Sequence, residues 1–260
     1  MEIRLDGRVA LVTGGSRGLG FAMGKAFAEA GADVVLLARR AAELAAAREA
    51  IIASSARRVL AIPCDVADAA QIASAWQQAE AAFGKIDILV NNAGSSKRGT
   101  IETLTDADWQ SDFDLKVFAA LRIARLAIPG MKARRWGRIL NLVNTLAKTP
   151  TAGSAPTSVS RAAGIAITKV MANELAPHNI LVNALCIGNI MSDQWPRFHA
   201  ADAGGATFEA FLAARAQSIP MRRLGEPGEL ASIACLLASD AGGYVTGTAI
   251  NVDGGLCPAV

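Results

Sequence analysis

Seven short apolar segments alternate with longer, alanine-rich segments along the chain, and this alternation limits the possible folds more than any other feature. The short segments carry aliphatic residues on both faces, which is typical of parallel strands that helices cover on either side. We predict strands at 9–13, 33–37, 59–63, 86–90, 138–143, 180–185 and 249–252. We predict helices at 20–30, 41–54, 69–83, 106–133, 156–176 and 227–239. The expected fold is α/β, with a right-handed, doubly wound parallel sheet of seven strands.

The composition agrees with a buried sheet and excludes several classes of function. Apolar residues make up 52% of the 260 residues but aromatic residues only 5%, so aliphatic side chains fill the core. The net charge of +3 is too small to indicate a nucleic-acid-binding or membrane-surface protein, and it is compatible with a small anionic ligand. Four widely separated cysteines and two histidines form neither a metal-binding pattern nor a disulfide framework.

No repeat or linker divides residues 1–260, so we expect one domain. No segment reaches the length of a membrane span and the first residues lack an apolar signal, which leads us to expect a cytoplasmic protein. The long irregular segment 188–222 is either a substrate lid or an ordinary helical insertion on the surface. Its aromatic residues suggest an apolar pocket: Trp195, Phe198, Phe208 and Phe211.

A glycine-rich segment follows the first predicted strand and opens the first helix. Glycines at 14, 18 and 20 permit a tight turn that lets backbone N–H groups approach a pyrophosphate at the helix N-terminus. A plain strand-to-helix turn is the alternative, but the position of the segment favours a nucleotide site. The residues predicted to contact the nucleotide here are Gly14, Ser16, Arg17, Gly18, Leu19 and Gly20.

The end of the second strand indicates which nucleotide is bound. A cofactor without a 2′-phosphate needs an acidic residue here for its ribose hydroxyls, yet the chain continues Arg39-Arg40. Arg39, supported by Arg17, suits a 2′-phosphate because guanidinium groups form charge-assisted pairs with phosphate. We therefore predict NADP(H) in preference to NAD(H). The alternative is that both arginines merely begin a solvated helix.

Together with further motifs, these features resemble the short-chain dehydrogenase/reductase family, of the kind that includes the 3-oxoacyl-carrier-protein reductases. The resemblance covers the whole chain and implies a Rossmann-like domain. The motifs are the glycine segment, Cys64-Asp65-Val66, Asn91-Asn92-Ala93-Gly94, the segment 179–184 and the tail 247–255. The resemblance implies that Asp65 and Val66 hold the adenine. It also implies that Asn92, Ala93 and Gly94 line the cofactor trough. Gly188, Ile190 and Ser192 match the segment that touches the nicotinamide in this family, although Ile187 replaces a usual proline.

The resemblance also implies four catalytic positions, and all four carry a different residue in this chain. Thr157 stands at the family's tyrosine, Arg161 at its lysine and Asn144 at its serine. Lys116 best matches the asparagine, with Asp114 as the competing residue. An aliphatic hydroxyl is a far weaker acid than a tyrosine, whose pKa is about 10, so Thr157 donates a hydrogen bond more readily than a proton. Arg161 still suits ribose hydroxyls, and Asn144 still suits polarisation of an oxygen.

Two residues are candidates for a replacement proton donor. Lys116 would have a depressed pKa if it were desolvated near Arg161, and a surface lysine on a partly exposed helix is the alternative. His199, in the presumed lid, titrates in a suitable range. The single tyrosine of the chain, Tyr244, precedes the last strand and is expected to pack structurally.

Three functions remain open from the sequence. The first is an NADP(H)-dependent oxidoreductase that acts on a small carbonyl or alcohol with an atypical proton-delivery site. The second is a nucleotide-binding pseudoenzyme that serves as a sensor or partner subunit, and the third is a lyase or isomerase on the same scaffold. The resemblance implies a homotetramer or homodimer paired through the helices at 106–133 and 156–176.

Overall fold

A parallel sheet of seven strands forms the centre of the computed structural model, which describes residues 2–260. Its strands follow the order β3-β2-β1-β4-β6-β8-β9, and every neighbouring pair is parallel. This order confirms the predicted doubly wound α/β sheet. The strands are β1(Val9–Thr13), β2(Asp33–Ala38), β3(Val59–Pro63), β4(Ile88–Asn91), β6(Gly137–Asn144), β8(Ile180–Ile187) and β9(Ala249–Val252).

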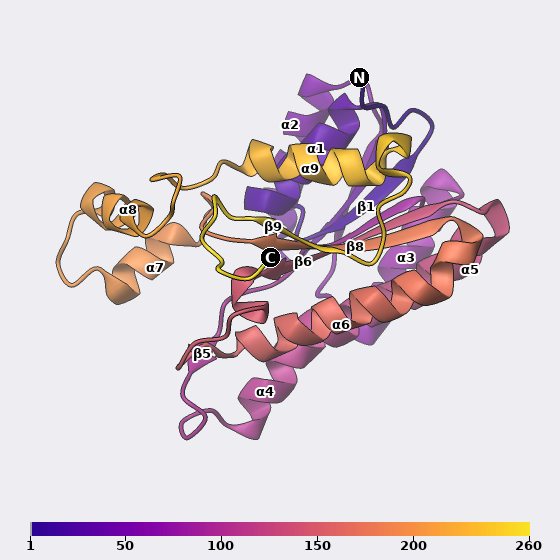
Figure 1. Ribbon diagram of the computed structural model, residues 1–260. Helices are drawn as coiled ribbons and strands as arrows, with labels where there is room; N and C mark the ends of the chain where they lie inside the picture. The colour runs from indigo at the N-terminus through magenta and orange to yellow at the C-terminus, as the bar shows by residue number, and fades with distance from the viewer. Residues whose placement is uncertain (1) are drawn as a thin grey trace.

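Helices cover both faces of this sheet (Figure 1). On one side lie α1(Gly18–Glu29), α2(Ala41–Ser54) and α9(Pro227–Ala238). On the other lie α3(Ala69–Phe83), α5(Ala119–Arg134) and α6(Thr157–Leu175). Along β1, Ala10 and Val12 pack into the core under α1, α2 and α9. Val9 and Leu11 pack into the core under α3, α5 and α6. The strand is buried on both faces, which explains why its sequence is a continuous apolar run rather than an alternating one.

The predicted helix at 106–133 is not continuous, which corrects the sequence prediction. It consists of α4(Asp106–Phe113), a π-helical turn η1(Asp114–Phe118) and α5. The backbone N–H of Ala119 donates to the carbonyl of Asp114, five residues earlier, which is the bond that defines a π turn. Sequence periodicity does not reveal one extra residue in a turn, because the apolar pattern resumes beyond it.

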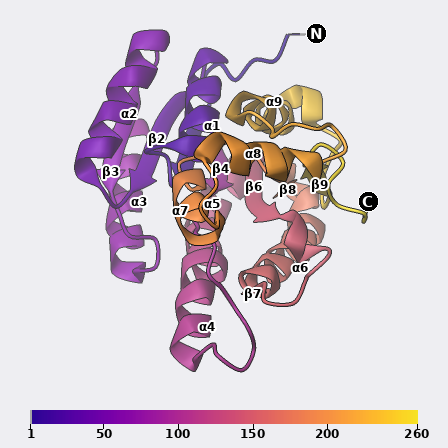
Figure 2. The ribbon, with the colours of Figure 1, turned by 90° about the vertical axis from the view of Figure 1, so that its left-hand side faces the viewer.

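Segment 188–222 is helical for much of its length, so it is not the irregular stretch that the sequence suggested. It contains α7(Trp195–Asp202) and α8(Phe208–Gln217), which lie beyond the carboxyl ends of the strands (Figures 1 and 2). The ring of Trp195 packs against Phe198 and Phe211, with centroids 5.7 and 6.2 Å away. The aromatic side chains therefore hold the two helices together.

Shorter elements complete the chain and were not predicted. The strands β5(Arg98–Gly99) and β7(Ala155–Pro156) pair antiparallel and bring the segment after β4 against the start of α6. Three 3₁₀ turns are η2(Thr145–Ala147), η3(Ala176–His178) and η4(Asp240–Gly242). Tyr244, expected to pack structurally, is fully exposed, so that expectation is wrong.

The close approach of α1 to the glycine turn generates a test of the fold. A Cβ at Gly20 would lie 2.2 Å from the carbonyl oxygen of Gly14, which is backbone and cannot rotate away. We expect Gly20→Ala to lower the free energy of unfolding by about 1–3 kcal/mol, because the turn must shift to admit the methyl group. Denaturant unfolding measures this change. The control is Gly228→Ala in α9, where nothing lies within 4 Å, and it should leave the unfolding free energy unchanged or slightly raised.

Candidate active site

A groove of about 310 Å³ lies at the carboxyl end of the strands. Most residues predicted to bind a cofactor line it, so the sequence motifs converge on one surface. The predicted residues that line the groove are Gly14, Ser16, Arg17, Gly18, Leu19, Gly20, Arg39, Asp65, Val66, Asn92, Ala93, Gly94, Arg161 and Ser192. Gly188 and Ile190 lie outside this lining, since Gly188 packs against Asp253 and Ile190 is in the core.

Hydrogen bonds with the residues that follow β4 fix the shape of the glycine turn. The side-chain amide of Asn92 donates to the carbonyl of Thr13 at 2.8 Å and to that of Gly14 at 3.3 Å. The hydroxyl of Thr13 in turn accepts from the backbone N–H groups of Asn92 and Ala93. Asn92 therefore shapes the turn as well as lining the groove. Thr13, a polar residue at the end of an apolar strand, was not singled out from the sequence.

The N-terminus of α1 suits an anion. Its N-cap residue is Arg17, whose side chain forms no capping hydrogen bond, and the first turn contains no acidic residue. The first backbone N–H groups are therefore available to a phosphate, which the helix dipole also attracts. Arg17 forms an ion pair with Asp193 at 3.5 Å, so its guanidinium already lies at the mouth of the groove between the turn and segment 188–222.

Two arginines, Arg39 and Arg40, line the groove, and only one of them has a partner. Arg39 is exposed and forms no hydrogen bond or ion pair with any residue in the range 2–260, whereas Arg40 pairs with Glu43 at 2.8 Å. Asp65 accepts from the backbone N–H of Ala67 through one carboxylate oxygen. Its other oxygen has no such partner among the described residues. A free guanidinium and a free carboxylate oxygen therefore face the same end of the groove.

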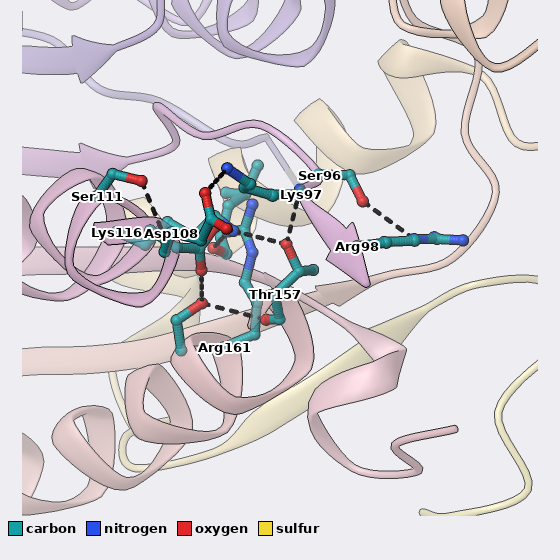
Figure 3. Close-up of polar contacts among 11 residues, drawn as sticks. Ser96, Lys97, Arg98, Asp108, Ser111, Lys116, Thr157 and Arg161 are labelled. Carbon is teal, nitrogen blue, oxygen red and sulfur yellow. Dashed lines mark hydrogen bonds and ion pairs between the residues drawn. The ribbon is translucent and has the colours of Figure 1, made fainter. Parts of the chain in front are cut away.

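Lys116 is buried at the inner end of the site, so the alternative of a surface lysine is wrong. Its side chain is 3% exposed, and its ammonium donates to Oδ1 of Asp112 and, at 2.8 Å, to the hydroxyl of Thr157 (Figure 3). Asp114, the competing residue, faces elsewhere and accepts hydrogen bonds from Gln110 and Arg122. Of the two, the structure brings only Lys116 to the cluster. We call Asp112, Lys116, Thr157, Ser160 and Arg161 the buried cluster.

The hydroxyl of Thr157 is saturated as an acceptor. It accepts from the Lys116 ammonium at 2.8 Å and from the backbone N–H of Lys97 at 3.1 Å. A hydroxyl has two acceptor lone pairs and one donor hydrogen, so these two bonds leave its own hydrogen free to donate. Thr157 is only 1% exposed and lies under the segment that contains Ser96 and Lys97.

Arg161 closes the cluster towards the groove. Its guanidinium donates to the carbonyl of Leu142 and lies so close to Gly94 that a Cβ there would be 2.7 Å away. Burial lowers the pKa of Arg161 to about 10, so it stays a cation at neutral pH. Burial, and next the charge of Arg161, lower the pKa of Lys116, and with Asp112 opposing both effects its pKa is about 8.

Asn144 lies at the end of β6, directly before η2, which packs against α6. The side chain of Asn144 makes no hydrogen bond with the described residues, and its buried amide oxygen has no partner. It forms no hydrogen bond with the buried cluster and does not line the groove. Its amide N–H groups are therefore free to donate to a ligand.

Known proteins resemble this chain over almost its whole length. The family model described as enoyl-(acyl carrier protein) reductase matches residues 14–257. The 3-oxoacyl-[acyl-carrier-protein] reductase FabG of Aquifex aeolicus is 30% identical over 256 residues, which cover 98% of this chain and 100% of that protein. The chain belongs to the short-chain dehydrogenase/reductase family.

Solved structures of this family superpose closely on the chain. The L-sorbose reductase of Gluconobacter frateurii, in complex with NADPH and L-sorbose, has a TM-score of 0.96 and 33% identity, and the match covers both chains fully. The NADPH-dependent reductase YwfH, involved in bacilysin biosynthesis, has a TM-score of 0.93 and 31% identity over 97% of this chain and 99% of that one. The fold is therefore that of a short-chain reductase, including segment 188–222.

His199, the second candidate proton donor from the sequence, does not join the site, and neither does the cysteine Cys186 of β8. His199 donates a hydrogen bond through Nε2 to the carbonyl of Ala206 at 2.8 Å, and its ring packs against Phe208 and Phe211. It therefore stabilises α7 and α8. Cys186 is buried, which raises the pKa of its thiol to about 11 and makes it a poor nucleophile. Across residues 2–260 there is neither a metal-ligating group of His, Cys, Asp or Glu nor a helix that could span a membrane.

Two members of the buried cluster, Asp112 and Ser160, were not predicted from the sequence. Asp112 and Ser160 match no family motif that was considered, yet both are almost fully buried. A signal was present, since Asp112 precedes Lys116 by four residues and such a pair lies on one helix face. The backbone N–H of Lys97 was also missed, because no side-chain pattern predicts a contact made by the main chain.

The buried ion pair generates a stability test. We expect Lys116→Met to lower the free energy of unfolding by about 3–5 kcal/mol, because it leaves the Asp112 carboxylate buried without its cation. The double variant Lys116→Met with Asp112→Asn should recover much of this loss. Lys97→Met removes an exposed ion pair with Asp108 and serves as the control, with no measurable change expected. Equal effects of both lysine variants in urea unfolding would contradict the assignment of Lys116 as a buried partner.

Proposed function

We propose that this chain is an NADP(H)-dependent oxidoreductase that interconverts a small carbonyl compound and its alcohol, with Lys116 as the source of the proton. The observation that carries this proposal is the 2.8 Å hydrogen bond from Lys116 to Thr157 beside the groove. In this proposal the catalytic site departs from the family pattern, because Thr157, Arg161 and Asn144 replace the tyrosine, lysine and serine.

The groove residues would hold the cofactor according to the chemistry of its parts. The N-terminus of α1 would take the pyrophosphate, and Asp65 the amino group of the adenine. Arg39 and Arg17 would take the 2′-phosphate, which makes NADP(H) the preferred cofactor, and Arg161 the nicotinamide ribose. Bound NADPH supplies a hydride to a carbonyl carbon. The NADPH named with the L-sorbose reductase and YwfH supports the same choice.

The residues of the chain would supply the proton in two coupled steps. As the carbonyl becomes an alkoxide, Thr157 gives its free hydroxyl hydrogen to the alkoxide oxygen and takes a proton from the Lys116 ammonium through the 2.8 Å bond. The amide of Asn144 would polarise the same oxygen. Since Thr157 is buried under Ser96 and Lys97, this segment must shift to admit the substrate oxygen.

Two further features complete the proposal. Segment 188–222 would act as the substrate lid of a single domain. A hydroxylated ketone is the first substrate class to test, because the G. frateurii reductase is described with L-sorbose.

Exposed apolar side chains on η1, α5 and α6 would pair copies of the chain into a homodimer or homotetramer. These side chains are Phe118, Leu126, Val159 and Val170.

The choice of cofactor can be tested at Arg39. We expect Arg39→Ala to weaken NADPH binding by about 10- to 100-fold and to leave NADH binding unchanged, because only NADPH carries the 2′-phosphate. Calorimetric titration of both cofactors measures the effect. Arg40→Ala is the matched control, since Arg40 already pairs with Glu43 and should matter less. If neither cofactor binds the native chain, the proposed function is wrong.

The role of Lys116 can be tested by the pH dependence of turnover. Lys116 carries its proton below a pH of about 8 and loses it above, so the rate of reduction should be constant below that pH and fall above it. The rate of alcohol oxidation should show the opposite dependence. Lys116→Arg keeps the ion pair with Asp112 but cannot release a proton near neutral pH. We expect it to lower reduction at pH 7 by about 10²–10⁴-fold and to remove the limb near pH 8.

The measurement follows the loss of NADPH absorbance with aldehydes, ketones, hydroxyketones and diketones. Tight NADPH binding with no turnover on any of them would favour the nucleotide-binding pseudoenzyme. Conversion of a substrate without a change in NADPH would favour a lyase or isomerase. A Lys116→Arg variant with the native rate and pH profile would exclude Lys116 as the proton source.

A further inference from the structure

The carboxylate of Asp112 has both oxygens occupied by partners from two helices. Asp112 is 4% exposed, near the end of α4. Its Oδ1 accepts from the Lys116 ammonium, and its Oδ2 accepts from the hydroxyl of Ser160 at 2.6 Å. Ser160 belongs to α6, three residues after Thr157. Asp112 therefore joins the helix that carries Lys116 to the helix that carries Thr157.

The charges around Lys116 show why this carboxylate matters. Two cations, Lys116 and Arg161, are buried close together, and the charge of Arg161 lowers the pKa of Lys116. Asp112 is the acidic side chain that faces both, since its charge acts on Lys116 and on Arg161. Two other nearby acidic side chains are turned away: Asp108 pairs with Lys97 and Asp114 with Arg122. Without Asp112, two like charges would share a buried site with no counter-ion.

The geometry also fixes the direction of the lysine. A lysine side chain is flexible and carries three donor hydrogens. Asp112 holds one of them and Thr157 another, so the ammonium bridges the two residues. Ser160 fixes the carboxylate that accepts the first. The hydrogen bonds form a continuous series from Ser160 through Asp112 and Lys116 to the Thr157 hydroxyl.

Building on the proposed function, we propose that Asp112, held by Ser160, is a positioning residue that keeps Lys116 protonated at neutral pH and directed at Thr157. Without the carboxylate, burial and the charge of Arg161 would act on Lys116 unopposed. Its pKa would fall further, and once it lies below 7 the group would be mostly a neutral amine at pH 7, with no proton to give. Asp112 would thus set the pH range in which this site reduces a carbonyl.

Asp112→Asn tests the proposal because the amide has the shape of the carboxylate without its charge. We expect the falling limb of the reduction rate to move by about 1–3 pH units towards acid, so the rate at pH 7 drops by about 2- to 100-fold and recovers at lower pH. Asp112→Glu should restore part of the native profile. Asp114→Asn, two residues away and paired with Arg122, is the matched control and should leave the limb in place.

A second readout does not depend on turnover. The chain has seven lysines, so NMR of ¹³C-labelled lysine can follow each ammonium group through a pH titration. The Lys116 resonance is assigned by its loss in Lys116→Arg. We expect its titration midpoint to fall in Asp112→Asn in parallel with the limb of the rate. Cofactor affinity should not change, because Asp112 lies outside the groove lining.

The outcomes separate this inference from the proposed function. If Lys116→Arg abolishes reduction but Asp112→Asn moves neither the limb nor the NMR midpoint, the inference about Asp112 is wrong and the proposed function stands. If Lys116→Arg keeps the native rate, the proposed function is wrong, and the NMR midpoint alone decides whether Asp112 holds the lysine's proton. Should Asp112→Asn fail to fold, Ser160→Ala replaces it, with a smaller acid shift expected and an unmoved midpoint overturning the inference.

Discussion

The buried ion pair between Lys116 and Asp112 is the interaction on which the rest of the site depends. Two cations lie at the inner end of the groove, and burying charge is costly unless each charge is paired and hydrogen-bonded. Arg161 satisfies part of its need with the carbonyl of Leu142, and Lys116 with Asp112 and Thr157. The contacts between α4, η1 and the start of α6 follow from this requirement. In the proposed function, the same buried contacts would also form the catalytic arrangement.

The main sheet was predictable from the sequence because its strands carry their own signal. Strand β1 is buried on both faces, so its apolar run could be read directly, and the glycine turn after it carries the backbone requirements of a nucleotide site. The elements that were missed lack such a signal. Strand β5 has two residues, and η1 differs from an α-helix by one hydrogen bond. Neither leaves a trace in apolar periodicity.

The candidate site was predictable in its groove and less so in its buried cluster. The family resemblance pointed to Thr157, Arg161 and Lys116 as site residues, with Asp114 left as the alternative to Lys116. It could not show that Lys116 is buried, since exposure depends on how α4 meets α6. Asp112 and Ser160 were missed for the same reason, because their contacts join residues 48 positions apart. The burial of Tyr244 was wrongly expected because an aromatic side chain by itself does not determine its environment.

The π turn has a consequence for how such a site could arise or be lost. Each residue advances an α-helix by about 100°, so one residue more or less turns everything beyond it to a new face. Asp112 lies before the extra residue of η1, and α5 lies after it. The π turn takes up one extra residue without that rotation, so deleting a residue from η1 would let the helix become regular with α4 and α5 keeping their faces, but it would change which side chains of the turn point towards Thr157. In this chain, the number of residues in the helix therefore helps to decide which charged side chains are buried, in addition to residue type.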